Sequence, residues 1–109
     1  TTHAFPAKGP GAAGAATLAG LRGNYPGGAP NAFGGLGFDA TRVLLAAMTG
    51  DADKNLASRI QNGAPLAGVT GPIDYTKGRR IPSKPVAIID AGRSRQTLAQ
   101  ITPGYVPRP

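Results

Sequence analysis

Few residues of this chain are of the types that carry out catalysis or bind metals. His3 is the single histidine, and the 109 residues include no cysteine. All five acidic residues are aspartates scattered along the chain. A general acid–base pair, a thiolate nucleophile or a thiolate metal site therefore has too few groups to be built. We expect no enzyme activity, no metal site and no cofactor.

A glycine-rich segment near the start of the chain has the spacing of a dinucleotide-binding loop. Gly9, Gly11 and Gly14 match G-x-G-x-x-G. In such a loop a strand leads into the glycines, and an acidic residue follows about twenty residues later. Here no apolar strand precedes Gly9, and the segment 29–34 contains no acid. The spacing alone therefore does not support a phosphate-binding role.

A second segment resembles the start of a calcium-binding loop. Asp51, Asp53 and Asn55 match its first three ligand positions. The same loop requires glycine at its sixth position and glutamate at its twelfth, where this chain has Leu56 and Asn62. We therefore expect Asp51 or Asp53 to cap the short helix that follows rather than to bind calcium.

The chain is strongly basic, with twelve Lys and Arg residues and a net charge of +7. Six basic residues gather in one stretch: Lys77, Arg79, Arg80, Lys84, Arg93 and Arg95. Modules that bind single-stranded nucleic acid interleave such charge with stacking aromatic residues, and only Tyr75 lies nearby. We expect this stretch to form a solvated, turn-rich surface rather than a groove for nucleic acid.

Large side chains are scarce for a chain that must form its own core. The sequence has 17 glycines, 11 prolines, three phenylalanines, three tyrosines and no tryptophan. A partly disordered chain would explain this composition, but the apolar clusters 43–48, 69–73 and 86–89 argue against it. We therefore interpret the chain as part of a larger protein whose remainder completes the core. No stretch is long and apolar enough to cross a membrane.

The central element is a predicted helix over 31–48. In it Leu36, Ala40, Val43, Leu44 and Ala47 recur at helical spacing and form one apolar face. Asp39 near its start and Arg42 three residues later suit the helix dipole and each other. Glycines 34, 35 and 37 crowd its beginning, where close backbone packing would explain them.

Further helices and strands are predicted on both sides of this helix. In the predicted strand 84–91, four consecutive apolar residues indicate burial on both faces, as in a parallel sheet covered by helices. A last strand is expected to pair beside it after a turn at Gly92. The predicted elements are an extended segment over 1–6, helices over 12–25 and 54–62, and strands over 73–75, 84–91 and 96–101.

In this order the residues resemble a known family. The segments are TTHAF, NYPGGAP, NAFGGLGFDATRVLLAAM, GVTGPIDYTKGRR and KPVAIIDAG. They are similar to the C-terminal third of the type I periplasmic solute-binding proteins of ABC transporters, the branched-chain amino-acid receptor group. Phe38-Asp39-Ala40 stands where that family has Tyr-Asp-Ala at the start of a helix. Gly68 to Tyr75 matches its Gly-x-x-Gly-x-Ile-x-Phe strand, and Lys84 to Gly92 its last crossing between lobes.

Two positions depart from the family pattern. Phe38 lacks the hydroxyl of the usual tyrosine, and the turn 76–79 is basic where the family turn is commonly acidic. The resemblance covers about 1–102 and rests on the ordered set of motifs, since each motif by itself is short.

The resemblance implies an α/β fold with two lobes, of which this chain holds an incomplete part. Residues 1–82 would form the C-terminal part of one lobe after a hinge crossing. Residues 83–102 would make the final crossing and strands of the other lobe, and 103–109 an extended tail. His3, Phe5 and Phe38 would lie nearest the cleft and are the predicted ligand-binding residues.

The function implied is that of an exported receptor subunit, either periplasmic or extracellular and membrane-anchored. It would bind a small solute, such as an amino acid or an aromatic or carboxylate compound, between its lobes. Its partners would be the solute, an N-terminal remainder of the same protein and an ABC permease in the membrane, without nucleic acid. Two alternatives remain open from the residues: a small basic structural or nucleic-acid-associated protein, and a ligand-sensing regulatory domain of the same fold.

Overall fold

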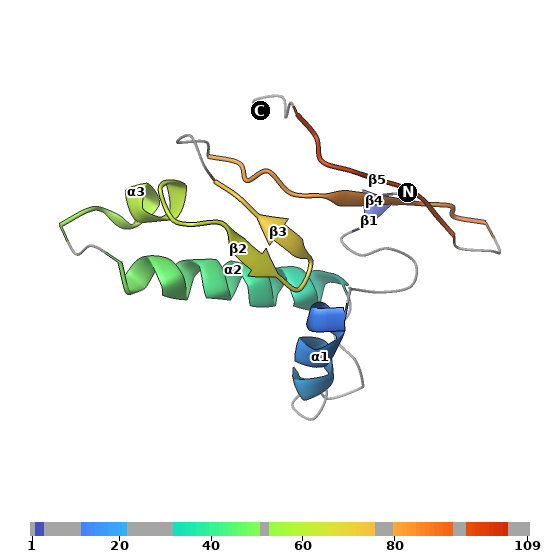
Figure 1. The fold of residues 1–109 in the computed structure, drawn as a ribbon, viewed down its shortest axis with the longest axis horizontal. Coiled ribbons are helices and arrows are strands. Elements are labelled where there is room, and N and C mark those ends of the chain that lie inside the picture. Colours follow the sequence, from blue (N-terminus) through green and yellow to red (C-terminus); the bar gives the residue numbers. More distant parts are fainter. Residues whose placement is uncertain are drawn as a thin grey trace.

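The computed structural model describes residues 2–3, 12–21, 32–50, 53–75, 80–92 and 96–104. These residues form three helices and five short strands (Figure 1). In chain order they are β1 (Thr2–His3), α1 (Ala12–Leu21), α2 (Ala32–Met48), α3 (Leu56–Gln61), β2 (Leu66–Gly68), β3 (Gly71–Ile73), β4 (Val86–Ile89) and β5 (Thr97–Ile101).

The strands form two separate antiparallel sheets. One has three strands in the order β1-β4-β5, and the other is the hairpin of β2 and β3. The expected pairing of β5 beside β4 is confirmed, with Val86 opposite Ile101. The expectation that the 84–91 strand belongs to a parallel sheet and is buried on both faces is wrong. β4 is antiparallel to both neighbours, and in it only Ala87 is buried.

The length of the connection explains the antiparallel pairing. Only residues 90–96 separate β4 from β5, whereas a crossover between parallel strands needs a dozen or more. Gly92 donates its N–H to the Asp90 carboxylate at 2.9 Å, and the Asp90 N–H donates to the Gln96 carbonyl at 2.9 Å. These bonds reverse the chain direction near Gly92, as predicted. An apolar run of four residues could not by itself distinguish the two kinds of sheet.

The longest element, α2, confirms the predicted central helix, and both α1 and the β2–β3 hairpin pack against it. The β2–β3 hairpin lies along one side of α2, and α1 crosses near the beginning of α2 (Figure 1). Leu18 of α1 and Val69 of the hairpin form a buried cluster with the partly buried Phe38 of α2. The hairpin itself was not predicted in full, since β2 was missed and the predicted strand 73–75 overlaps β3 only at Ile73.

The short helix α3 is capped by a different residue from the one expected. Asn55 is the N-cap, and its side chain accepts a 2.8 Å hydrogen bond from the Ser58 N–H. Asp53 lies in the preceding turn, and Asp51 lies outside the described residues. Asparagine is as good a cap as aspartate, and its place directly before the helix decides the choice.

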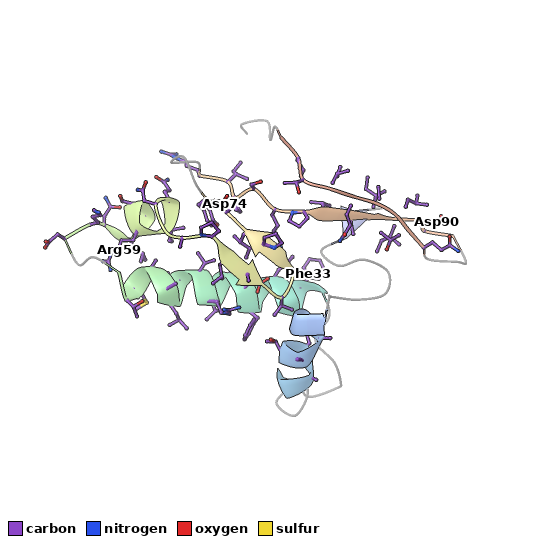
Figure 2. The ribbon with its side chains drawn as sticks, in the orientation of Figure 1. Phe33, Arg59, Asp74 and Asp90 are labelled. Carbon is purple, nitrogen blue, oxygen red and sulfur yellow. The ribbon has the colours of Figure 1, made fainter. Side chains whose placement is uncertain are left out.

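One arginine joins α3 to the end of α2. Arg59 donates from Nη1 to the carbonyls of Ala47 (3.0 Å) and Met48 (3.4 Å), and from Nε to the carbonyl of Lys54 (2.8 Å). Figure 2 shows Arg59 where the two helices meet. The last carbonyls of a helix have no partner within it, and a cation there also suits the helix dipole. The contact therefore stabilises both the end of α2 and the position of α3.

The core of this arrangement is small and much apolar surface is exposed. Among the residues that the structure describes, five hydrophobic ones are buried: Leu18, Ala47, Val69, Ile73 and Ala87. Phe33, Leu45 and Met48 of α2 are exposed by 81, 56 and 61%. The radius of gyration is 15.3 Å, against about 13 Å for a compact domain of this length. An extended shape with few buried side chains leaves apolar faces open to other molecules.

The predicted apolar face of α2 is divided between the core and this exposed surface. Ala47 is buried and Val43 half-buried, whereas Ala40 and Leu44 are exposed. A Cβ built on Gly37 meets nothing within 4 Å, so close packing within this chain does not explain that glycine. No helix among the described residues is long and apolar enough to cross a membrane.

The exposed face of α2 can be tested with a fluorescent dye for apolar surface. We expect the chain to enhance the fluorescence of anilinonaphthalene sulfonate, and the double substitution Phe33→Ser with Met48→Ser to reduce that enhancement. Both side chains are exposed, so neither change should destabilise the fold by more than about 0.5 kcal/mol. The matched control is Ala40→Ser with Ala46→Ser on exposed positions of the same helix. Equal dye binding by both double variants would contradict the assignment.

Candidate functional site

A buried carboxylate lies between α2 and the β2–β3 turn. Asp39 is 1% exposed. Its Oδ1 accepts the N–H of Val69 at 2.7 Å, and its Oδ2 accepts the N–H of Thr70 at 2.8 Å and the Thr70 hydroxyl at 2.6 Å. Hydrogen bonds to an ionised acceptor are short and strong. Three such bonds offset the desolvation of a charge that would otherwise be costly to bury.

This contact corrects the role expected of Asp39. The sequence predicts Asp39 near the start of its helix, where it would suit the dipole and pair with Arg42. In the structure α2 begins at Ala32 and has no acid in its first turn, so Asp39 lies two turns inside. Its carboxylate binds a turn thirty residues further along the chain.

Two glycines make room for the carboxylate and its turn. A Cβ on Gly68 would lie 2.6 Å from Oδ2 of Asp39 and 2.8 Å from the Gly71 carbonyl oxygen. Gly71 has φ of +103°, a conformation that other residues rarely adopt. A Cβ on Gly71 would also lie 2.9 Å from Cγ of Pro85. The G-x-x-G spacing is therefore a requirement for close approach on both sides of the turn.

A lysine connects the β2–β3 turn to the segment that precedes β4. Lys84 donates from Nζ to the Thr70 carbonyl at 2.6 Å and also hydrogen-bonds the Thr70 hydroxyl. Burial lowers the pKa of the Lys84 ammonium, and the negative charge of Asp39 partly opposes that shift. We name Asp39, Val69, Thr70 and Lys84 the turn cluster. It joins α2, the hairpin and the segment that precedes β4.

A second basic residue holds the other side of the hairpin. Arg42 donates from Nη1 to the Ala67 carbonyl at 3.0 Å, and its guanidinium carbon lies 6.0 Å from the centre of the Phe38 ring. At that separation the cation–π attraction is at the limit of its usual range. Arg42 therefore acts mainly as a donor to the backbone of β2.

Two of the three predicted ligand-binding residues lie within the described part of the chain. Phe38 is half-buried and packs against Leu18 and Val69. The backbone of His3 lies in β1, opposite Ala87 of β4. Phe5 lies outside the described residues. A cleft role for these residues stays a prediction.

The sequence does not predict the turn cluster, because its residues lie in separate segments and no one segment contains a motif for it. Asp39 was noted for its helix and Lys84 for the basic stretch, where a solvated surface was expected. That expectation is wrong for Lys84, which is half-buried against Thr70. Arg80 is exposed, and the other four residues of the stretch lie outside the described residues.

The chemistry available to the turn cluster is structural. Its hydroxyl is buried, with Thr70 only 3% exposed, and it is occupied by hydrogen bonds to Asp39 and Lys84. Among the residues that the structure describes, no group of three or more His, Cys, Asp and Glu side chains could hold a metal ion. The cluster fixes the distance between α2 and the hairpin and so positions whatever surface they form.

Comparison of the chain with family models, with curated proteins and with solved structures finds no match.

The turn cluster predicts a large effect of removing one charge. Asp39→Asn retains an acceptor but turns an amide N–H₂ toward the Thr70 N–H, so we expect a loss of about 3 kcal/mol in the free energy of unfolding. Urea denaturation measures the loss, and faster hydrogen exchange at the Val69 and Thr70 amides locates it. Asp53→Asn, at an exposed position, is the control. Equal stability of the two variants would show that Asp39 does not hold the turn.

The lowered pKa of Lys84 predicts a pH dependence of stability. Because this pKa is lower in the folded than in the unfolded chain, the unfolded chain binds more protons between the two values. The free energy of unfolding contributed by this group therefore rises with pH through that window, up to about pH 10.4. Lys84→Met should remove this rise in urea denaturation, and the exposed Lys54→Met should retain it. An unchanged slope in Lys84→Met would contradict the prediction.

Proposed function

We propose that this chain is the C-terminal part of an extracytoplasmic solute-binding receptor of the type I periplasmic class, serving an ABC importer. Its solute would be a small molecule such as an amino acid or an aromatic or carboxylate compound, held between two lobes. The observation that carries the proposal is the contact of Asp39 with the turn between Gly68 and Gly71. These residues belong to two separate motifs of the family resemblance.

The contact supports the proposal because a single interaction explains why both the Phe-Asp-Ala triplet and the G-x-x-G segment are present. The acid of the Phe-Asp-Ala triplet accepts the two N–H groups inside the G-x-x-G turn, and Gly68 leaves the space that the carboxylate fills. Motifs that matched by chance would have no need to meet, thirty residues apart. The mixed helical and antiparallel architecture is compatible with an α/β fold.

The exposed apolar surface supports the second part of the proposal, that a remainder of the same protein covers this chain. Large apolar residues are exposed on several elements, among them Phe33 at 81% on α2 and Leu98 at 66% on β5. Surfaces of this kind are typical of faces that pack against further polypeptide. In a two-lobed receptor, elements from elsewhere in the chain would provide that packing.

A receptor of this kind works by differential affinity. The solute contacts both lobes only in the closed state, and so shifts the open–closed equilibrium toward it. The permease would then recognise the closed form. On this proposal the turn cluster keeps α2 and the hairpin together as one rigid unit while the lobes move.

The proposal is tested first on the gene and then on its product. We expect an open reading frame that extends some two hundred residues or more before Thr1 and begins with an export signal. Its purified product should gain thermal stability with one member of a panel of amino acids and aromatic carboxylates, as a ligand that binds only the folded state must cause. A reading frame without that extension would refute the proposal.

Phe5 provides a test of the cleft within that full-length protein. We expect Phe5→Ala to weaken solute binding by about tenfold, equivalent to ~1.4 kcal/mol, because an aromatic contact is lost. Isothermal titration calorimetry with the solute found in the panel measures the change. Phe33→Ala, an identical truncation on α2, should leave the affinity unchanged. Unchanged affinity in Phe5→Ala would remove Phe5 from the cleft.

A further inference from the structure

We propose that Asn62 is a site of spontaneous deamidation, at the end of α3. The chain has four asparagines, and Asn62 is the one followed by glycine. In this reaction the backbone nitrogen of the next residue attacks the side-chain carbonyl carbon. A glycine in that position has no side chain to hinder the approach and leaves the backbone free to adopt the reactive conformation.

The reaction needs only water. The Gly63 nitrogen forms a bond to Cγ of Asn62, the Cγ–Nδ2 bond breaks, and ammonia leaves with the proton of the Gly63 N–H. Water then opens the resulting succinimide at either carbonyl, which gives aspartate or isoaspartate at position 62. No oxidation or reduction takes place.

The fold itself explains why a glycine follows this asparagine. A Cβ on Gly63 would lie 3.1 Å from the Arg59 carbonyl oxygen and 3.5 Å from that of Ile60, so larger residues crowd the turn that ends α3. The requirement for a tight helix end therefore places an unhindered amide beside an asparagine. Both Asn62 and Gly63 are exposed to water.

The hydrogen bonds at this helix end slow the reaction but do not block it. Nδ2 of Asn62 donates to the carbonyl (2.9 Å) and hydroxyl (3.3 Å) oxygens of Ser58. The Gly63 N–H donates to the Ile60 carbonyl over a long 3.4 Å. α3 has six residues and none of them is buried, so opening of its last turn requires little free energy. The reactive conformation is reached through that opening.

The product is less suited to its position than the asparagine. An aspartate at 62 loses the two donated bonds and turns a carboxylate toward the Ser58 carbonyl. It also puts a negative charge at a helix C-terminus, where the dipole is unfavourable. Arg59 lies one turn earlier and binds carbonyls of α2. The new carboxylate at position 62 would compete with those carbonyls for the Arg59 guanidinium. Deamidation is therefore expected to loosen α3 from α2.

The experiment is incubation of the full 109-residue chain at mildly alkaline pH, followed over time by peptide mapping with mass spectrometry. We expect a gain of one mass unit at position 62, as a mixture of aspartate and isoaspartate. The rate should exceed that at Asn55 by at least about tenfold, a difference of ~1.4 kcal/mol in activation free energy. Asn55 is the internal control, since it lies at the other end of the same helix and is followed by leucine.

Two further samples complete the design. The same incubation in concentrated urea should raise the rate at Asn62, because the Ser58 bonds are then absent. Asn62→Asp supplies the product directly, and faster hydrogen exchange in α3 than in the parent chain is expected. Equal rates at Asn62 and Asn55 in the folded chain would overturn the proposal. So would conversion at Asn62 that yields no isoaspartate, because direct hydrolysis without the succinimide gives aspartate alone.

Discussion

The architecture depends on one buried carboxylate that accepts hydrogen bonds from a turn. Asp39 is almost wholly removed from water, and an unpaired charge in that position would not be tolerated. The N–H groups of Val69 and Thr70 face the same interior and also need acceptors. The Asp39 carboxylate and the two N–H groups therefore satisfy each other's hydrogen-bonding needs. The hairpin can lie against α2 only in the register that brings these groups together.

This mutual dependence explains a hairpin that lacks the usual turn residues. Gly68 pairs with Gly71 across the hairpin, so Val69 and Thr70 form a two-residue loop. Such loops favour Asn-Gly or Asp-Gly, because those residues adopt the required backbone conformations readily. Here the stabilisation comes instead from a side chain on another element. Thr70 then passes the interaction on to Lys84, so that one carboxylate organises three separate segments.

The sequence predicted the elements better than their arrangement. The helix at 31–48 and the pairing of the last two strands followed from local periodicity and turn chemistry, and both are confirmed. The turn cluster could not be predicted in this way, since Asp39 and Thr70 are far apart in the chain and Asp39 had a sufficient local explanation in its helix. The one available signal was the pair of glycines at 68 and 71, which marks a close approach without identifying what approaches. Parallel pairing was expected from an apolar run whose neighbours were unknown.

The placement of the basic residues also bears on the choice between a receptor and a nucleic-acid-associated protein. Five Lys and Arg residues lie in the described part of the chain. Three of them, Arg42, Arg59 and Lys84, donate to backbone carbonyls. Their charge is used within the fold and is not displayed as a stripe for phosphates.

The exposed surface of α2 is uncharged and largely apolar, unlike a surface that binds phosphates. Between 33 and 48 the exposed residues of this helix are all uncharged, and they include Phe33, Leu45 and Met48. Interfaces with nucleic acid are polar and strongly basic, whereas an uncharged apolar helix face is suited to another protein surface. The net charge of the whole chain would favour the first partner, but the residues that α2 presents favour the second. In the described residues, the positions of the charges and apolar side chains therefore favour the proposed receptor more than their totals do.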